Sequence, residues 1–198
     1  MSERKVKILV GKFDSVKVVE SRTVYNKHGR LILEDVLEFA DGSRHEWVYF
    51  KASGAAVAIA AFTDDNRMIL TRQYRHPFGK VIYDIPAGGM KDGETLEQAA
   101  LRELEEETGY TAEKLDRIGR FTWALGAMGP ATVEIFFTKS LKPKGDFDPK
   151  EIMNIELVDF NKVLNGVLRG DYLDSALVIA TLFVSVKKLI QHQASSTS

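Results

Sequence analysis

Residues 95–108 restrict the fold and the function of this chain more than any other segment. They open with the pattern of a capping box, a threonine followed three positions later by a glutamine, and Gly109 stands where a left-handed residue ends a helix. The segment therefore predicts one helix. At about 100° per residue, Glu103 and Glu107 fall on the side of this helix that also carries its apolar residues. A helix that only displayed charge to solvent would keep its carboxylates opposite the apolar stripe, so this helix is expected to serve a site.

Three carboxylates gather on this predicted helix: Glu103, Glu106 and Glu107. A solvated acidic face is one interpretation, but like charges at this spacing repel one another, and a divalent cation would reverse the repulsion. The chain contains no cysteine, which excludes zinc–thiolate sites, thiol nucleophiles and disulfide scaffolds. Carboxylate oxygens without cysteine or a nearby histidine favour a hard cation, so we predict a site for Mg²⁺ or Mn²⁺.

The spacing around the helix resembles the Nudix box without a mismatch. Gly88 is followed after five residues by Glu94, and after seven more by the run Arg102-Glu103-Leu104-Glu105-Glu106-Glu107-Thr108-Gly109-Tyr110. The resemblance implies a hydrolase of nucleoside diphosphates that are linked to another moiety. It also implies an α/β fold, an α/β/α sandwich around a mixed sheet.

Carried over by position, the resemblance assigns Glu103, Glu106 and Glu107 as catalytic residues and metal ligands, together with the backbone carbonyl of Ala87. Metal ions in such a site would neutralise a pyrophosphate, lower the pKa of a bound water and align that water with a phosphorus. Arg102 stands four residues before Glu106, so the two side chains can pair on one helix face. We expect Arg102 to orient this ligand rather than to touch substrate.

The chain divides into two predicted parts. Residues 1–52 alternate like three strands joined by turn signals at residues 26–29 and 40–43, which predicts a small N-terminal antiparallel β-sheet. Residues 53–198 form the predicted Nudix hydrolase domain. In this second part the apolar runs predict strands near residues 55–62, 68–74, 81–85, 115–123, 132–139 and 152–158.

Three other segments complete the expected domain. Residues 86–89, rich in proline and glycine, predict a turn before the box helix. A helix is expected to start after a cap at Asp159, and a last helix to cover about residues 172–191.

Two stretches outside the box resemble the branch of the family that hydrolyses ADP-ribose and nucleotide sugars: Arg72-Gln73-Tyr74-Arg75-His76-Pro77 and Ile85-Pro86-Ala87-Gly88. The resemblance implies that Arg75 binds the diphosphate, a bidentate task that suits a guanidinium, with Arg72 as a second substrate-binding residue. Glu134, on the strand predicted near residues 132–139, is a further candidate for lining the site. An ordinary place on the strand surface is the alternative for Glu134.

One loop departs from the pattern of the ADP-ribose-specific members. Those members tend to carry a proline about 16 residues past the box, often within a Ser-Pro-Gly, whereas residues 123–130 are rich in glycine, lack Ser-Pro-Gly and place Pro130 about 20 residues past Tyr110. The departure favours a broader set of nucleoside diphosphate sugars, GDP-mannose among them. In the same branch the catalytic base commonly comes from a late loop, which here holds Asp146, Asp148 and Glu151. Glu151 is the predicted base.

The resemblance also implies an assembly. In this branch the N-terminal sheets are exchanged across a homodimer and lend an aromatic ring to the nucleotide base of the partner. A sheet of about fifty residues cannot bury a core of its own, so it must pack on something. We therefore predict a homodimer with composite sites and Trp47 as the stacking residue. Packing of the sheet on its own chain is the alternative.

The composition of the chain limits the kinds of partner that it is expected to bind. The 27 basic residues balance the 28 acidic ones, which argues against a protein that coats nucleic acid. The longest apolar run, residues 176–186, is shorter than the about 20 residues that cross a membrane. With no signal-peptide pattern and no cysteine, a cytoplasmic protein is expected. Two rival functions remain: a cleaner of modified nucleoside triphosphates, and a Nudix module that senses nucleotides without hydrolysing them.

Overall fold

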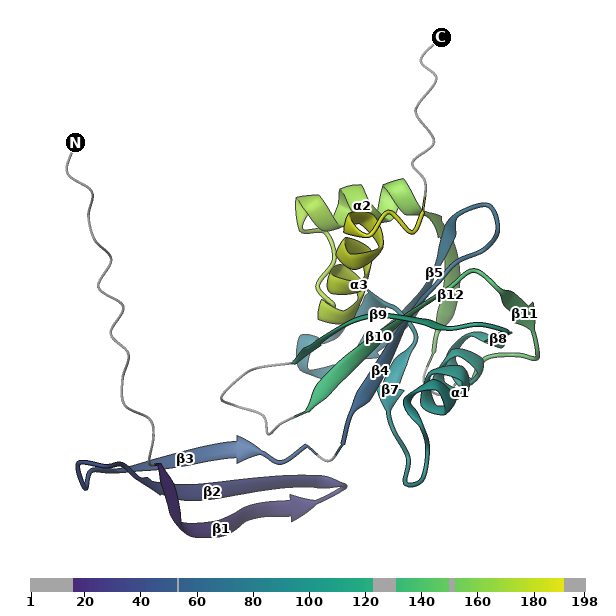
Figure 1. The fold of residues 1–198 in the computed structure, drawn as a ribbon. Coiled ribbons are helices and arrows are strands. Elements are labelled where there is room, and N and C mark those ends of the chain that lie inside the picture. Colours follow the sequence, from purple (N-terminus) through teal and green to yellow (C-terminus); the bar gives the residue numbers. More distant parts are fainter. Residues whose placement is uncertain (1–15, 53, 123–130, 150–151, 191–198) are drawn as a thin grey trace, which may run out of the picture. The chain divides into compact units, whose positions relative to one another are not determined.

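The computed structural model describes residues 16–52, 54–122, 131–149 and 152–190 of the 198-residue chain. The described residues form two compact units, of which one ends before residue 53 and the other begins at Gly54. Figure 1 shows both units with their elements labelled.

The first unit is a three-stranded antiparallel sheet. Its strands are β1 (Lys17–Lys27), β2 (Arg30–Glu38) and β3 (Arg44–Phe50), in the order β1-β2-β3. His28 and Gly29 join β1 to β2 with φ angles of 54° and 69°. Two consecutive positive φ angles belong to the turn whose twist matches a β-hairpin. The predicted small N-terminal sheet is confirmed.

The second unit contains two sheets and a short ribbon. A four-stranded mixed sheet has the order β7-β4-β10-β9, a three-stranded antiparallel sheet has the order β12-β5-β6, and β11 pairs with β8. The strands are β4 (Ala56–Ala61), β5 (Arg67–Arg75), β6 (Lys80–Asp84), β7 (Ala87–Gly89), β8 (Tyr110–Ala112), β9 (Asp116–Thr122), β10 (Thr132–Thr138), β11 (Leu141–Pro143) and β12 (Asn154–Asp159). A 3₁₀ turn, η1 (His76–Phe78), joins β5 to β6, and the helices are α1 (Leu96–Thr108), α2 (Phe160–Arg169) and α3 (Ser175–Val186).

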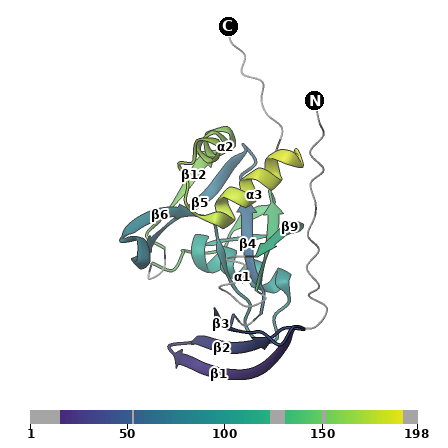
Figure 2. The ribbon, with the colours of Figure 1, turned by 90° about the vertical axis from the view of Figure 1, so that its left-hand side faces the viewer.

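Strand β4 lies at the centre and is buried on both faces, as its unbroken apolar sequence predicts. Ala58 and Ala60 pack in the core beneath α2 and α3. Val57 and Ile59, which point the other way, pack in a second core beneath α1. Figures 1 and 2 show α1 on one side of the strands and α3 on the other. The predicted α/β/α sandwich with a mixed sheet is confirmed.

Both ends of α1 form the caps that the sequence predicts. Thr95 accepts a hydrogen bond from the backbone of Gln98, whose side chain accepts one from the backbone of Thr95, so the capping box is formed. Gly109 ends the helix with φ of 71°, and its carbonyl accepts hydrogen bonds from the backbone N–H groups of Lys144 and Gly145. The loop after β11 therefore closes the C-terminal end of α1.

The sequence prediction needs three corrections. Residues 87–89 form β7, which pairs with β4 instead of serving only as a turn. The last helix is shorter than predicted, because Asp174 caps its first turn and Lys187 already lies beyond its end. Strands β8 and β11 were not predicted, since three residues carry too little periodicity to reveal a strand.

Gly109 supplies a test of this arrangement. A Cβ at Gly109 would overlap the backbone carbonyl of Gly145, and its φ is also positive. A left-handed φ alone costs about 1 kcal/mol when glycine is replaced by alanine. Because the overlap adds to this cost, Gly109→Ala is expected to lower the free energy of unfolding by more than about 2 kcal/mol. Gly93→Ala, at φ of 83° with open space around it, is the matched control that carries only the cost in φ. Equal losses in urea titrations of the two variants would contradict the contact.

Candidate functional site

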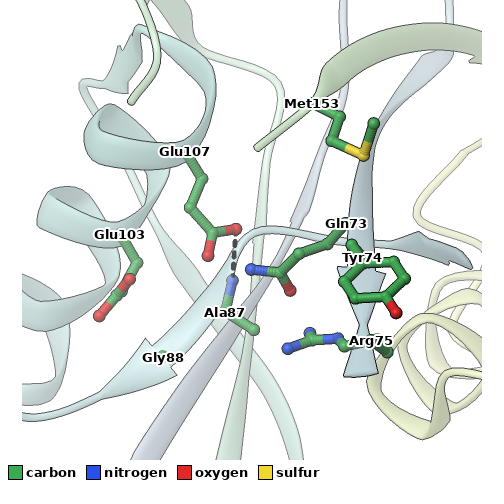
Figure 3. Close-up of a pocket in the computed structure, with 8 residues that line it drawn as sticks. All are labelled: Gln73, Tyr74, Arg75, Ala87, Gly88, Glu103, Glu107 and Met153. Carbon is green, nitrogen blue, oxygen red and sulfur yellow. Dashed lines mark hydrogen bonds between the residues drawn. The ribbon is translucent and has the colours of Figure 1, made fainter. Parts of the chain in front are cut away.

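A cavity of about 530 Å³ opens between α1 and the ends of several strands in the second unit. Strand β5 contributes Gln73, Tyr74 and Arg75, β7 contributes Ala87 and Gly88, α1 contributes Glu103 and Glu107, and Met153 completes the lining (Figure 3). The cavity thus joins the predicted box helix to the predicted arginine-bearing strand.

The two α1 carboxylates in this cavity are buried. Glu103 is 8% exposed and Glu107 is 5% exposed, because the polar positions overlap the apolar stripe as the wheel predicts. The backbone N–H of Ala87 donates to the Glu107 carboxylate at 3.3 Å. A Cβ at Gly88 would overlap the Glu103 carboxylate in its present position, so glycine here leaves room for that carboxylate beside β7. Burial raises the pKa of Glu103 above its ordinary value, against the opposing effect of Arg102.

Arg102 connects the loop before α1 to the carboxylates of the helix. It donates to Glu94 through Nε at 2.6 Å and Nη2 at 2.9 Å, and to the carbonyl of Gly89 at 2.9 Å. Its Nη1 reaches Glu103 at 2.6 Å and Glu106 at 3.0 Å. The predicted pairing of Arg102 with Glu106 is confirmed. Hydrogen bonds from Arg102 lower the pKa of Glu94 to about 2.

The third box carboxylate lies differently. The Glu106 side chain is 45% exposed, pairs with Lys91 at 3.2 Å as well as with Arg102, and is not among the cavity residues. Within the described ranges, no three acidic or histidine side chains stand together as a ready metal site. The donor set nevertheless suits a hard cation, because Glu103 and Glu107 present oxygens beside the Ala87 backbone in one buried wall.

The opposite wall of the cavity carries Arg75, which forms an ion pair with the buried carboxylate of Asp84 on β6. The other oxygen of Asp84 accepts the backbone N–H of Ile85 at 2.9 Å. Gln73, Tyr74 and Met153 are cavity residues to which the sequence analysis gave no role. Gln73 could have been found, because it lies two residues before Arg75 and therefore shares its face of β5.

Arg72, on the same strand, has its partners outside the cavity lining. Its guanidinium lies 5.2 Å from the ring centroid of Tyr83 and 3.5 Å from Glu156, and it is not among the cavity residues. Glu134 is buried on β10 and accepts hydrogen bonds from Arg117 of β9, also away from the cavity lining. Trp47 belongs to the first unit and is 47% exposed.

The structure describes only part of the loop that was predicted to carry the catalytic base. The backbone N–H of Asp148 donates to the carbonyl of Glu106 at 2.7 Å, and Asp146 is exposed. This loop therefore lies at the C-terminal end of α1, the helix that carries the cavity carboxylates. Glu151, the predicted base, and residues 123–130, the predicted specificity loop, fall outside the described residues.

Known proteins resemble this chain over nearly its whole length. The NUDIX domain family matches residues 52–180. The ADP-ribose pyrophosphatase of Bacillus subtilis (strain 168) is 33% identical over 187 residues, which are 90% of this chain and 100% of that protein. A methanol dehydrogenase activator of Bacillus methanolicus is 27% identical over 187 residues, 93% of this chain and 100% of its own.

Among solved structures, one described as the crystal structure of an ADP compounds hydrolase superposes with a TM-score of 0.81. It is 21% identical in sequence, and the match covers 93% of this chain and 100% of that one. At that identity the likeness shows a shared fold. A separate feature of the described residues is that no helix is long and apolar enough to cross a membrane.

The Glu94–Arg102 pair generates a prediction about acid stability. Because Arg102 lowers the pKa of Glu94 to about 2, the pair contributes stability at neutral pH that is lost as the pH falls toward that value. Glu94→Gln should therefore show a smaller drop in unfolding free energy between about pH 5 and about pH 2 than the wild type. Glu113→Gln, which removes an exposed carboxylate paired with Lys142, is the control and should follow the wild type. Parallel curves for Glu94→Gln and the wild type would contradict the assignment.

Proposed function

The chain belongs to the Nudix family of hydrolases, and from this premise we propose that it hydrolyses the pyrophosphate bond of nucleoside diphosphate sugars. The products are a nucleoside monophosphate and a sugar phosphate. The observation that carries the proposal is the cavity in which two buried carboxylates, Glu103 and Glu107, share a lining with Arg75. A pyrophosphate needs both a cation site and a fixed positive side chain, and this lining offers the residues for each.

ADP-ribose is the first substrate to test. The relative from Bacillus subtilis, similar over its full length, is named an ADP-ribose pyrophosphatase, which supports this choice. The glycine-rich residues 123–130 lack the Ser-Pro-Gly of the specific members, which supports a wider range that includes GDP-mannose. We propose ADP-ribose with related nucleotide sugars, and not a single substrate.

Mg²⁺ is the proposed cofactor, with Mn²⁺ as a substitute, and Glu103, Glu106, Glu107 and the carbonyl of Ala87 would hold it. When bound, the metal would neutralise charge on the diphosphate and lower the pKa of a bound water. For Glu106 to take part, its side chain would leave Lys91 and turn toward the other two carboxylates. That change is a rotation of a half-exposed side chain and requires no movement of α1.

The chain's own residues perform the remaining steps in this proposal. Arg75 binds the diphosphate with its planar guanidinium, and Asp84 keeps that guanidinium at the cavity wall. Glu151 is the proposed general base, carried by the loop whose Asp148 backbone is bound to the end of α1. Arg72 and Glu134 remain proposed substrate residues, although neither is among the cavity residues described above.

The proposal is tested by monophosphate release from a panel of substrates with Mg²⁺ present. ADP-ribose and at least one other nucleotide sugar are expected to yield the monophosphate. Pyrophosphate or phosphate release from modified nucleoside triphosphates, with no action on the sugars, would replace the proposal with the triphosphate-cleaning function. Binding of nucleotide sugars with no release would indicate the sensing module.

Glu107→Gln is expected to reduce turnover of the best substrate at least tenfold at saturating Mg²⁺, with little loss of stability. The variant removes one of the buried carboxylates that would hold the metal, and a tenfold loss corresponds to about 1.4 kcal/mol of barrier. Glu105→Gln is the matched control, because Glu105 lies on the same helix but pairs with Lys144 at 2.7 Å. Steady-state kinetics and thermal unfolding measure both variants. Turnover of Glu107→Gln above a tenth of the wild-type rate would contradict the assignment.

We also propose a homodimer in which the N-terminal sheets are exchanged and Trp47 stacks on the nucleotide base of the partner's substrate. In the described sheet, β1 is exposed along its whole length and bears large apolar side chains that include Val18 and Val24. Three strands of this size do not bury a core, which supports a covering partner.

Light scattering is expected to give twice the chain mass of 22.2 kDa. Mixing Trp47→Ala with Glu107→Gln subunits should restore part of the activity, because one of the two composite sites would then carry no substitution. A monomer with full activity would end the dimer proposal and leave the hydrolase proposal intact.

A further inference from the structure

Both carboxylate oxygens of Glu106 are paired with positive side chains of this chain. Lys91 Nζ donates to Oε1 at 3.2 Å, and Arg102 Nη1 donates to Oε2 at 3.0 Å. Glu106 is not among the cavity residues, which include the other two box carboxylates, Glu103 and Glu107. The proposed metal would therefore have to displace a positive side chain before it could use all three carboxylates.

Arg102 is a fixed partner of Glu106. Its side chain is only 17% exposed and also donates to Glu94 and to the carbonyl of Gly89, which both lie outside α1. The same Nη1 that reaches Glu106 also reaches Glu103, at 2.6 Å. Moving Arg102 would therefore break the contacts that hold the loop before α1 against the helix. For this reason Arg102 is not the side chain that a cation can displace.

Lys91 is the displaceable partner. Its side chain is 62% exposed, and its ammonium group ends a flexible chain of four carbons. An exposed ion pair of this kind contributes little to stability, so the pair breaks easily. The backbone N–H of Lys91 donates to Glu94 at 2.8 Å, and this bond does not depend on the side chain. A substitution at position 91 thus frees Oε1 of Glu106 and leaves the bond between the loop and Glu94 in place.

We propose that Lys91 is a positioning residue that competes with the proposed metal for Glu106 and thereby lowers the affinity of the site for Mg²⁺. This inference rests on the proposed function, which supplies the metal site. An oxygen that accepts from an ammonium group cannot approach a divalent cation without bringing two positive charges together. Metal binding and the Lys91–Glu106 pair therefore oppose each other, and by linkage each weakens the other to the same extent.

Lys91→Met removes the ammonium group and keeps an unbranched apolar side chain of similar length. Binding of Mn²⁺ to the substrate-free protein is followed by electron paramagnetic resonance, and displacement of Mn²⁺ by Mg²⁺ gives the Mg²⁺ affinity. The Kd of Lys91→Met for each cation is expected to be about twofold to fivefold lower than that of the wild type, the range that one exposed ion pair supplies. Lys91→Arg retains a positive side chain and should not show this gain.

Lys144→Met is the matched control for the loss of one positive charge. Lys144 pairs with Glu105 of the same helix at 2.7 Å, and its backbone N–H is likewise hydrogen-bonded, to the carbonyl of Gly109. This variant is expected to bind both cations as tightly as the wild type. A Glu106→Gln background removes the carboxylate for which Lys91 competes, so in that background Lys91→Met should no longer tighten binding.

Three results would overturn the proposal: an unchanged Kd in Lys91→Met, an equal gain in Lys144→Met, or a gain in Lys91→Met that persists in the Glu106→Gln background. A different result would refute the metal site of the proposed function and this inference with it: neither the wild type nor Lys91→Met would bind Mn²⁺ or Mg²⁺. None of these measurements requires monophosphate release from a nucleotide sugar, so the proposed substrate can fail while the role of Lys91 stands.

Discussion

The guanidinium of Arg102 makes the contacts on which the arrangement of the site depends. Glu103 and Glu106 would repel each other and the nearby carboxylate of Glu94, and Arg102 donates to all three while also binding the carbonyl of Gly89. A guanidinium can do this because its N–H groups project in a rigid planar fork, whereas an ammonium offers one compact charge. The loop before α1 and the polar face of α1 are therefore held in register by a single side chain.

Strand β7, at the edge of the four-stranded sheet, contacts carboxylates of the same helix. Glycine at position 88 allows β7 to run against the Glu103 carboxylate, and the Ala87 N–H donates to Glu107. Two acidic side chains are thereby buried beside backbone that can offer both donors and acceptors. Burial of a carboxylate without hydrogen-bond partners would be costly in free energy. The buried carboxylates of α1 therefore depend on the backbone of β7 for partners and for space.

The cavity also separates charges of opposite sign. Its α1 wall is acidic, and its β5 wall carries Arg75, whose own charge is balanced from behind by Asp84. Such a division suits a ligand that meets a cation on one side and a guanidinium on the other, as the proposed pyrophosphate would.

The features that the sequence determined by itself are local ones. The capping box, the left-handed Gly109, the apolar stripe of α1 and the unbroken apolar run of β4 each depend on residues within one or two turns or one strand of each other. Such neighbours set backbone hydrogen bonds and decide which face is buried, whatever the rest of the chain does. The spacing of the box carboxylates with Arg102 belongs to the same class, whereas the sandwich was expected from the resemblance that this spacing carries.

Tertiary structure alone decided which distant side chains meet. Tyr83 and Glu156 are 73 positions apart, yet the Tyr83 hydroxyl donates to the Glu156 carboxylate at 3.0 Å, and nothing in the pattern around either residue indicates the other. Two arginines of the same strand can also have different surroundings: Arg75 lines the cavity, while Arg72 lies over the ring of Tyr83. Strand register and helix packing bring such groups together through long-range contacts. A sequence motif can name an arginine and a carboxylate, but the partner that orients each one depends on which segments pack against it in the folded chain.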